Sequence, residues 1–203
     1  MLISIHPETP QDRLVRQAVT ILEKGGVIIY PTDTLYAFGC SIMSKKAVSQ
    51  VAKLKNISPD KAQFSCICRD LSDIGNYGLQ ISTPVFKVLK QVLPGPYTFI
   101  LKASREVPRH FQSKQKTIGV RYVDHPIAQA IVDALGHPLL SASIPMEPDT
   151  YWVDPRDLHD TWGNQVDLVI DGGMGDVIPS TVIDCSDDEF EIIREGKGDT
   201  SFL

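Results

Sequence analysis

Residues 26–39 constrain the fold of this chain more than any other stretch, and they read Gly-Val-Ile-Ile-Tyr-Pro-Thr-Asp-Thr-Leu-Tyr-Ala-Phe-Gly. Residues 27–30 form a short apolar run, which is typical of a strand covered on both faces. Pro31 has no backbone N–H, so the strand must end there. Residues 32–34 then carry two hydroxyls and a carboxylate at the carboxyl end of the strand, where open α/β sheets bind ligands. The pattern predicts a ligand site, or else a proline-containing turn whose side chains bond only to local amides.

Five helices are predicted from a capping residue or proline that precedes apolar residues at helical spacing. Their starts are marked by Thr9-Pro10, Ser44, Thr83-Pro84, Asp124 and Asp154-Pro155. Their ends are marked by Gly25-Gly26, Lys55, Pro94-Gly95-Pro96, Gly136 and Trp162. In the helix that begins at Thr83, Phe86 is among the apolar side chains expected to face inward.

Eight strands are predicted from short apolar or alternating runs. They cover residues 27–30, 64–68, 97–103, 117–123, 139–143, 166–170, 180–184 and 189–194. The last two are expected to form a hairpin, whereas helices alternate with strands earlier, and residues 104–116 are expected to form a loop with a short helix. The fold class is therefore α/β, a single domain over residues 1–203 with a sheet of mixed parallel and antiparallel strands.

The charge of the chain is unevenly distributed. Residues 1–143 hold 17 Lys and Arg against 10 Asp and Glu, a net charge of about +7, while residues 144–203 hold 3 against 15, about −12. The basic residues gather at 45–61 and 102–116, which permits a polyanionic partner. The alternative is that these residues form solvated faces whose charges cancel on folding.

Several classes of protein are excluded by what the sequence lacks. No apolar run approaches the ~20 residues needed to span a bilayer, and the N-terminus has neither the basic region nor the cleavage site of a signal peptide. The four cysteines show no CxxC spacing, so we expect reduced thiols in a cytoplasmic protein. No phosphate-binding P-loop, zinc-ligand cluster or nucleophile-elbow motif is present, and no metal-binding residue is predicted.

Hydroxyl groups and single cations recur instead at the predicted strand ends. They are Thr32, Thr34, Thr98, Ser141, Ser143, Ser180, Thr181, Arg121 and Arg194. Arg121 follows the run Ile118-Gly119-Val120, and a guanidinium buried there is costly unless it is paired. Its partner is either an anionic ligand, phosphate or carboxylate, or a salt bridge to Asp33 or Asp124.

Five segments together resemble the motifs of the YrdC/YciO family and follow the family's order. They are Tyr30-Pro31-Thr32-Asp33-Thr34, Pro94-Gly95-Pro96-Tyr97-Thr98, Ile118-Gly119-Val120-Arg121, Ser141-Ala142-Ser143 and Ser180-Thr181-Val182-Ile183-Asp184. The tail Ile193-Arg194-Glu195-Gly196, followed by Gly198-Asp199, resembles the YciO branch in particular. The resemblance implies a twisted YrdC-like α/β sheet with a large concave basic groove.

For the YrdC branch the resemblance implies synthesis of L-threonylcarbamoyladenylate from L-threonine, bicarbonate and ATP, for tRNA modification. Mg²⁺ and protein cations would then neutralise the ATP phosphates. The implied roles are catalytic for Lys55 and Arg121, substrate-binding for Thr32, Thr34 and Thr98, and nucleotide-binding for Ser141, Ser143, Ser180 and Arg194.

Two positions depart from the synthase branch, which carries Lys-x-Arg and Ser-x-Asn where this chain has Lys55-Asn56-Ile57 and Ser143-Ile144-Pro145. Losing one such cation or donor at a reacting phosphate typically costs ~10²–10³ in rate. We therefore predict a threonylcarbamoyl-AMP synthase-like nucleotidyltransferase of weak or altered activity. The alternative is a YciO paralogue that binds double-stranded RNA, tRNA or a nucleotide on the basic groove without synthase activity.

Overall fold

The computed structural model describes residues 1–58, 64–146 and 151–203. The strands are β1 (Leu2–Ser4), β2 (Ile28–Tyr30), β3 (Ala37–Gly39), β4 (Ser65–Ile67), β5 (Tyr97–Lys102), β6 (Thr117–Arg121), β7 (Leu139–Ser143), β8 (Leu168–Asp171), β9 (Thr181–Asp184) and β10 (Glu191–Arg194). The helices are α1 (Asp12–Glu23), α2 (Lys45–Leu54), α3 (Leu71–Tyr77), α4 (Thr83–Val92), α5 (Pro126–Leu135) and α6 (Pro155–Trp162). Lys61, one of the basic residues noted above, lies outside the described residues.

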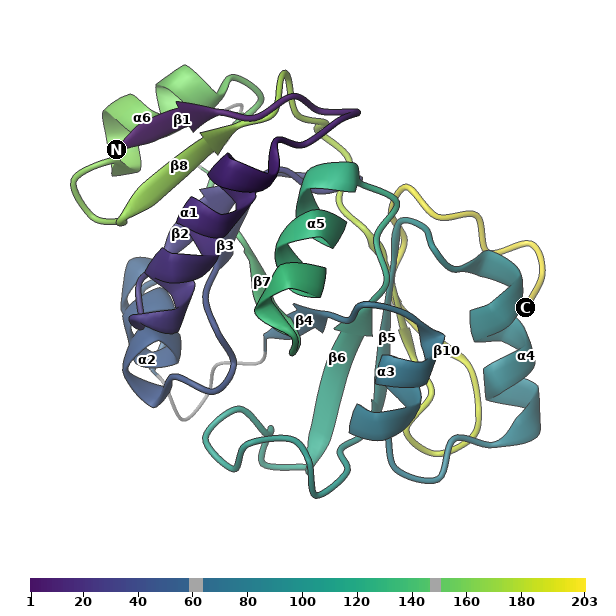
Figure 1. Ribbon diagram of the computed structural model, residues 1–203. Coiled ribbons are helices and arrows are strands. Elements are labelled where there is room, and N and C mark those ends of the chain that lie inside the picture. Colours follow the sequence, from purple (N-terminus) through teal and green to yellow (C-terminus); the bar gives the residue numbers. More distant parts are fainter. Residues whose placement is uncertain (59–63, 147–150) are drawn as a thin grey trace.

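Within these residues the strands form one ten-stranded sheet in the order β1-β8-β2-β3-β7-β4-β6-β5-β9-β10 (Figure 1). β8 is parallel to β1 and β2, β4 is parallel to β6, and β5 is parallel to β9. The remaining pairs are antiparallel, including the predicted hairpin of β9 and β10. The predicted α/β class with a mixed sheet is therefore confirmed.

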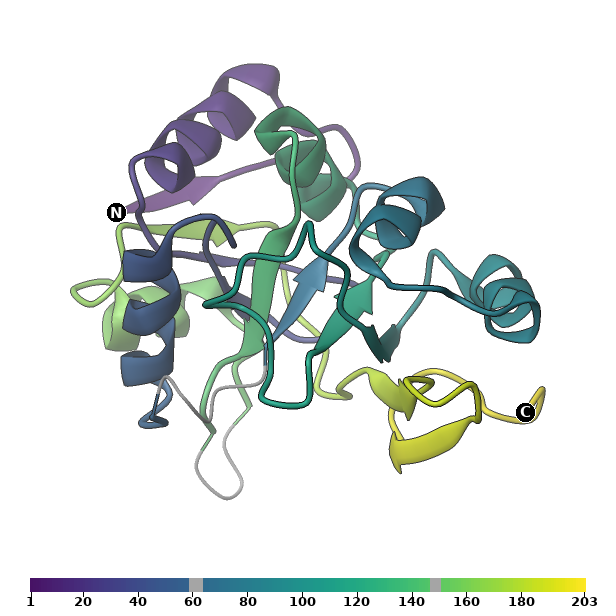
Figure 2. The ribbon, with the colours of Figure 1, turned by 90° about the horizontal axis from the view of Figure 1, so that it is seen from below.

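Two groups of buried apolar side chains cover the two faces of the sheet. α1 and α5 pack beside each other on one face, where Leu22 and Ile131 join Ile28 of β2. The neighbouring residues Val27 and Ile29 point the other way and belong to the second group, together with residues of α2 and α6. Both faces of β2 are thus buried, as its apolar run predicts. Figure 2 shows α1 and α5 together on one side of the sheet, with the yellow β9–β10 hairpin far from the N-terminus.

Two of the predicted helix caps are confirmed, since the side chains of Ser44 and Asp154 accept amide hydrogen bonds in the first turns of α2 and α6. The prediction that Thr9 caps the first helix is wrong. The Thr9 hydroxyl lies 3.0 Å from Nδ1 of His6, and the helix begins only at Asp12. A local hydrogen bond has taken the side chain that was expected to cap.

Asp124 also caps no helix, because α5 begins after His125, and the Asp124 backbone amide donates to Oδ2 of Asp33 at 3.2 Å. Turns replace the short helix that was expected in residues 104–116. The predicted inward orientation of Phe86 is wrong as well, because its side chain is 42% exposed on α4. None of the helices in the described part of the chain is long and apolar enough to cross a membrane.

Candidate active site

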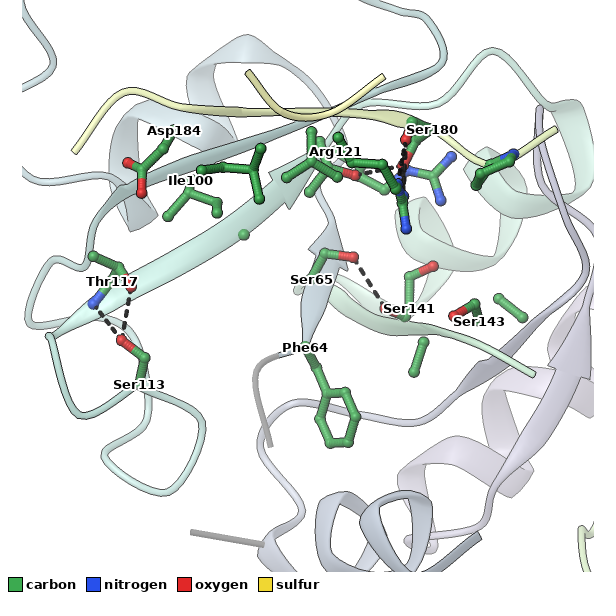
Figure 3. Close-up of a pocket in the computed structure, with 18 of the residues that line it drawn as sticks. Phe64, Ser65, Ile100, Ser113, Thr117, Arg121, Ser141, Ser143, Ser180 and Asp184 are labelled. Atoms are coloured by element: carbon green, nitrogen blue, oxygen red, sulfur yellow. Dashed lines mark hydrogen bonds between the residues drawn. The ribbon is translucent and has the colours of Figure 1, made fainter. Parts of the chain in front are cut away.

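A cavity of about 690 Å³ opens on the face of β5, β6 and β9, and its floor is built from alternate residues of these strands (Figure 3). Those floor residues are Thr98, Ile100, Lys102, Thr117, Gly119, Arg121, Val182 and Asp184. The residues between them point to the opposite side, where Phe99, Val120 and Ile183 are fully buried in the core. The two-residue period of the strands therefore places a mostly polar set of side chains at the cavity and an apolar set in the core.

The walls of the cavity come from segments that are far apart in the sequence. They are contributed by the turn after β2, the end of α2, β4, the 111–117 region, β7, and the tail around Arg194. Eight of the nine predicted site residues line this one cavity: Thr34, Lys55, Thr98, Arg121, Ser141, Ser143, Ser180 and Arg194. The prediction that polar strand ends converge is thus realised in the structure, whereas the substrate or catalytic role of each residue stays a prediction.

Thr32 is the predicted site residue that does not line the cavity. Its hydroxyl lies 2.8 Å from the carbonyl oxygen of Leu35 and accepts a 3.1 Å hydrogen bond from the amide of Thr34. These contacts match the alternative prediction of a proline-containing turn with local hydrogen bonds. Thr32 thus shapes the turn that presents Thr34 to the cavity.

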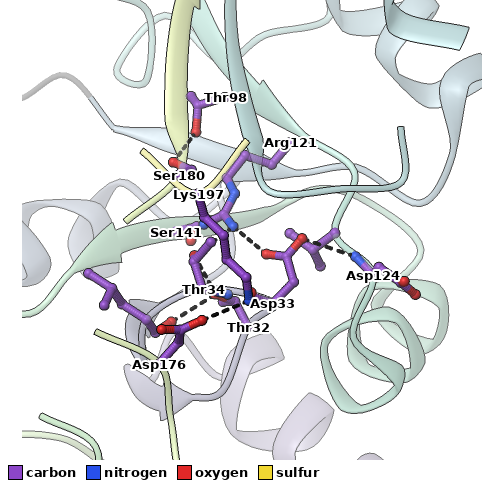
Figure 4. Close-up of polar contacts among 12 residues, drawn as sticks. Thr32, Asp33, Thr34, Thr98, Arg121, Asp124, Ser141, Asp176, Ser180 and Lys197 are labelled. Carbon is purple, nitrogen blue, oxygen red and sulfur yellow. Dashed lines mark hydrogen bonds and ion pairs between the residues drawn. The ribbon is translucent and has the colours of Figure 1, made fainter. Parts of the chain in front are cut away.

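Arg121 forms a buried salt bridge with Asp33, one of the two alternatives predicted from the sequence. Its guanidinium donates to Oδ1 of Asp33 at 2.6 Å and to the Thr34 hydroxyl at 3.0 Å (Figure 4). Arg121 is only 6% exposed, and its Nε is buried without a hydrogen-bond partner among the described residues. A cavity-lining donor of this kind is suited to an anionic ligand as a further partner.

Arg194 brings a second guanidinium to the same cavity. Its Nε and one terminal nitrogen donate to the carbonyl oxygen of Ser180 at 3.1 and 2.8 Å. The Ser180 hydroxyl is in turn 2.9 Å from the hydroxyl of Thr98. Burial lowers the pKa of Arg194, and the positive charge of Arg121 lowers it further. Two neighbouring guanidinium groups repel each other, so a bound anion would stabilise both.

Lys55 follows α2 and is held against β7. Its ammonium donates to the carbonyl oxygen of Ser143 and lies 3.4 Å from the Ser143 hydroxyl. Burial lowers the pKa of this ammonium group. The two positions that depart from the synthase branch lie close by in sequence but do not line the cavity. Ile57 packs against the apolar core, and the Pro145 carbonyl oxygen accepts a 2.7 Å hydrogen bond from Trp152.

Sequence reasoning missed several residues of the cavity, among them Ser65, Lys102 and Asp184. The available signal was strand alternation, because Thr98 and Lys102 must share a face. Gly119 was also missed, although it lies at the centre of the floor, where a Cβ would come within 3.1 Å of the Ser65 side chain. Its lack of a side chain keeps the floor flat and lets a ligand approach the backbone closely.

No three His, Cys, Asp or Glu side chains gather as metal ligands within residues 1–58, 64–146 and 151–203. The carboxylates that line the cavity are Asp184 and Asp187, and Asp187 forms a 3.4 Å ion pair with Lys102. The charged side chains that line the cavity therefore fall into two groups. One contains the cations Lys55, Arg121 and Arg194, and the other contains Lys102 with the carboxylates Asp184 and Asp187.

Comparison with known proteins assigns the family. The sequence model of the Sua5/YciO/YrdC family, which carries the description "Telomere recombination", matches residues 20–196. The chain belongs to the Sua5/YciO/YrdC family. It is 47% identical over 198 residues to the uncharacterized protein YciO of Escherichia coli (strain K12), a match that covers 96% of this chain and 95% of that protein. The crystal structure of E. coli YciO superposes with a TM-score of 0.92 over 99% of this chain and 98% of that one, at 45% identity.

More distant members of the Sua5/YciO/YrdC family carry a named activity. A threonylcarbamoyl-AMP synthase of Coxiella burnetii (strain RSA 493) is 30% identical over 161 residues, which cover 79% of this chain and 86% of that protein. The crystal structure of P. abyssi Sua5 complexed with L-threonine has a TM-score of 0.87 at 22% identity, and the match covers 97% of this chain and 57% of that one. At this identity the similarity to Sua5 shows a shared fold.

Proposed function

We propose that this protein is an ATP-dependent threonylcarbamoyl-AMP synthase-like enzyme of low activity. The observation that carries the proposal is the pair Arg121 and Arg194 in one cavity, ringed by the hydroxyls of Thr34, Thr98 and Ser180. Two guanidinium groups can donate charge-assisted hydrogen bonds to a phosphate chain, and the Nε of Arg121 has no partner among the described residues. The hydroxyl groups can form hydrogen bonds with the polar groups of an amino acid. The named synthases at 30–33% identity and a Sua5 structure complexed with L-threonine support the same reaction class.

The proposed reaction has two steps, and both balance without a protein nucleophile. The amino group of L-threonine attacks bicarbonate and gives a carbamate with loss of water. A carbamate oxygen then attacks the α-phosphorus of ATP, the bond to the β-phosphate oxygen breaks, and pyrophosphate leaves. Arg121 and Arg194 would stabilise the negative charge that develops on the phosphate oxygens. Ser141 and Ser143, on the β7 wall, would contact the nucleotide.

Mg²⁺ would enter with ATP and would be bound mainly through the phosphate oxygens. Mg²⁺ usually keeps several water ligands and takes only one or two protein carboxylates beside substrate phosphates. Asp184 of the cavity floor is a carboxylate available for such a contact. The protein residues would then orient the phosphates and exclude water around them.

Low activity follows from the surroundings of Lys55. Its ammonium already donates to the carbonyl oxygen of Ser143, so that donor is not available to a ligand. Ile57 supplies no cation and Pro145 no amide side chain, unlike the residues of the synthase branch. Each missing group would cost ~10²–10³ in rate at a reacting phosphate.

The proposal is tested by pyrophosphate release from purified protein with ATP and Mg²⁺. Release should require both L-threonine and bicarbonate, and the nucleotide product should be threonylcarbamoyl-AMP by mass spectrometry. A variant with Arg121→Met and Asp33→Asn, which removes the cation without leaving a lone buried carboxylate, should release no pyrophosphate. Release that ignores threonine, or none at all in the wild type, would reject the synthase assignment.

A second candidate function is RNA binding, with tRNA or double-stranded RNA as the partner. The exposed residues Lys45, Lys46 and Lys53 of α2, and Arg105, Arg109, Lys114 and Lys116 of the loop before β6, form no salt bridge in the described part of the chain. The same loop contributes Phe111 and Ser113 to the cavity. The cations of this loop lie next to residues of the cavity wall, and the absence of salt bridges at all seven cations within the described residues favours a polyanion over mutual charge cancellation.

A further inference from the structure

Residues 194–199, which begin at the last residue of β10 and are called the tail here, are held against the rim of the cavity by hydrogen bonds of their backbone. The amides of Gly196 and Lys197 donate to the Thr181 hydroxyl at 3.1 Å and to the Pro179 carbonyl oxygen at 2.8 Å. The Gly198 carbonyl oxygen accepts a 2.7 Å hydrogen bond from the same Thr181 hydroxyl. These bonds fix the backbone of residues 196–198 beside β9, and they therefore limit the directions in which the side chains of the tail can point.

The two glycines of this tail are required by close contacts. A Cβ at Gly196 would overlap the backbone of Pro179 and Ser180, and a Cβ at Gly198 would overlap the ring of Tyr97. The pattern Arg-Glu-Gly-Lys-Gly-Asp therefore describes a segment pressed onto the sheet, with a cation at its first and fourth positions. Arg194 is the first of these, and it reaches the cavity wall through Ser180.

Lys197, the second cation, contacts two other segments, the turn after β2 and the loop before β9 (Figure 4). Its ammonium donates to the backbone carbonyl oxygen of Asp33 at 2.9 Å and forms a 2.7 Å ion pair with Asp176. The amide of Asp176 donates to the carbonyl oxygen of Thr34 at 3.2 Å. Lys197 thereby joins the tail, the loop before β9 and the turn after β2 at a single point.

The two cations of the tail are linked in different ways to the two guanidinium groups of the cavity. Arg194 belongs to the tail itself, while Arg121 is held by Asp33 and Thr34 of the turn that Lys197 contacts. We propose that Lys197 is a positioning residue, which fixes the distance between Arg194 and Arg121 by tying the tail to the turn. A fixed spacing of two cations presents a preorganised site to a phosphate chain, and loss of that spacing weakens binding and catalysis.

Lys197 differs from the residues that would contact the ligand in its position and in its partners. Its ammonium group is satisfied by Asp33 and Asp176, and Lys197 does not line the cavity in the described structure. The ligand part of this inference rests on the proposed function, since it takes ATP as the ligand. The anchoring part does not, because the tail and the turn are joined whatever the cavity binds.

The test compares Lys197→Met, which keeps the length of the side chain, with Lys197→Arg, which keeps its charge. Amide hydrogen exchange is measured over residues 194–199, with strand β7 as the internal reference. In Lys197→Met we expect exchange of the tail amides to speed up roughly tenfold or more, with no change in β7. Lys197→Arg should restore slow exchange. Lys87→Met is the matched control, because Lys87 is an exposed lysine of α4.

The same variants are tested for ATP binding by calorimetry and for pyrophosphate release. Lys197→Met should weaken ATP binding and raise the KM for ATP by roughly tenfold or more, and Lys197→Arg should rescue both. Asp176→Asn removes the charged partner alone and should shift each quantity in the same direction by less. Wild-type exchange and KM in Lys197→Met would overturn the inference. A wild type that neither binds ATP nor releases pyrophosphate would reject the proposed function, while the exchange data would still decide whether Lys197 anchors the tail.

Discussion

Arg121 shows how far a single residue can be interpreted from sequence. Its place in an apolar-flanked strand predicts a buried charge that needs a partner, and the structure provides one in Asp33. Local sequence could not choose between Asp33, Asp124 and a ligand, because 88 positions separate Arg121 from Asp33 and only the sheet order brings them together. Its Nε has no hydrogen-bond partner among the described residues, so the salt bridge does not use every donor of the guanidinium.

Replacement of Arg121 by alanine should weaken ATP binding by about 2–5 kcal/mol, because a desolvated charge contact is lost. The variant should also unfold more easily by about 3–5 kcal/mol, because Asp33 would stay buried without its counter-charge. Calorimetry measures the first effect and urea unfolding the second. Adding Asp33→Asn should recover stability but not ATP binding. Equal ATP affinity in the wild type and Arg121→Ala would make Arg121 purely structural.

The ion pair of Asp176 and Lys197 predicts a pH dependence of stability. Lys197, followed by the amides of Val177 and Ile178, lowers the pKa of Asp176 from its usual 3.8. A lowered pKa in the folded state means that the stabilisation is present above pH 3.8 and is lost as the pH falls through the folded pKa. Wild type should therefore exceed Asp176→Asn in stability at pH 6, and the difference should shrink below pH 3.8. A difference that stays constant from pH 6 to pH 2.5 in urea unfolding would contradict this.

At the scale of helices and strands, the sequence predicts the elements that carry a clear period. β7 has the predicted bounds, and α2 and α6 begin at the predicted caps. The elements that were not predicted are β1, β3 and α3, which are three, three and seven residues long. Segments this short contain too few repeats of the helix or strand period to stand out in the sequence, and they form because neighbouring strands and the core stabilise them.

The ends of α2 and β7 meet where Lys55 contacts Ser143, and this is where the two departures from the synthase branch lie. The double variant Ile57→Arg with Pro145→Asn should raise kcat/KM for adenylate formation, because it adds one cation and one amide donor. Each group could contribute about 2–4 kcal/mol if the backbone already has the right path. The single variants should give less than their sum, since both groups would act on one substrate.

The structure also sets a condition on this experiment. Ile57 packs against the core, and the Pro145 carbonyl oxygen is bound to Trp152, so unfolding and ATP binding of the double variant must be measured beside its rate. A double variant that folds and binds ATP like the wild type, yet releases no more pyrophosphate, would show that these positions do not limit activity.

At the scale of the whole molecule, the cavity depends on segments spread from the turn after β2 to the tail at Arg194. Motif recognition could predict many of its polar residues, because most of those lie in or beside a strand. It could not predict that the Thr32 hydroxyl bonds within the turn instead of lining the cavity, or that Lys55 bonds to Ser143. Nor could it predict that Lys197 connects the tail to the turn after β2. Those facts depend on distances between elements, which local sequence does not encode.

The uneven charge of the chain predicts how RNA would bind. Affinity should fall steeply with salt, because phosphate contacts release counterions. Lys114→Glu with Lys116→Glu should weaken binding and lower the slope of log K against log salt by about 2. Filter binding of a double-stranded RNA from 50 to 200 mM salt measures both. Glu189→Gln with Glu191→Gln, in the β9–β10 hairpin region, serves as the control away from the loop. Unchanged affinity in the lysine variant, or a flat salt dependence, would exclude these residues as the binding surface.

The order of strands also sets when the cavity can form during synthesis. β5 lies between β6 and β9, so one of its neighbours is the next strand in the chain and the other is made only after α5, β7, α6 and β8. A nascent chain that has emerged through α6 already contains Thr98 and Arg121, but it has neither β9 nor Arg194. Pairings between such distant segments are slow to form. The two guanidinium groups therefore come to share a cavity only after the ribosome has delivered β9 and β10, so a nascent chain that ends before these strands lacks the complete cavity.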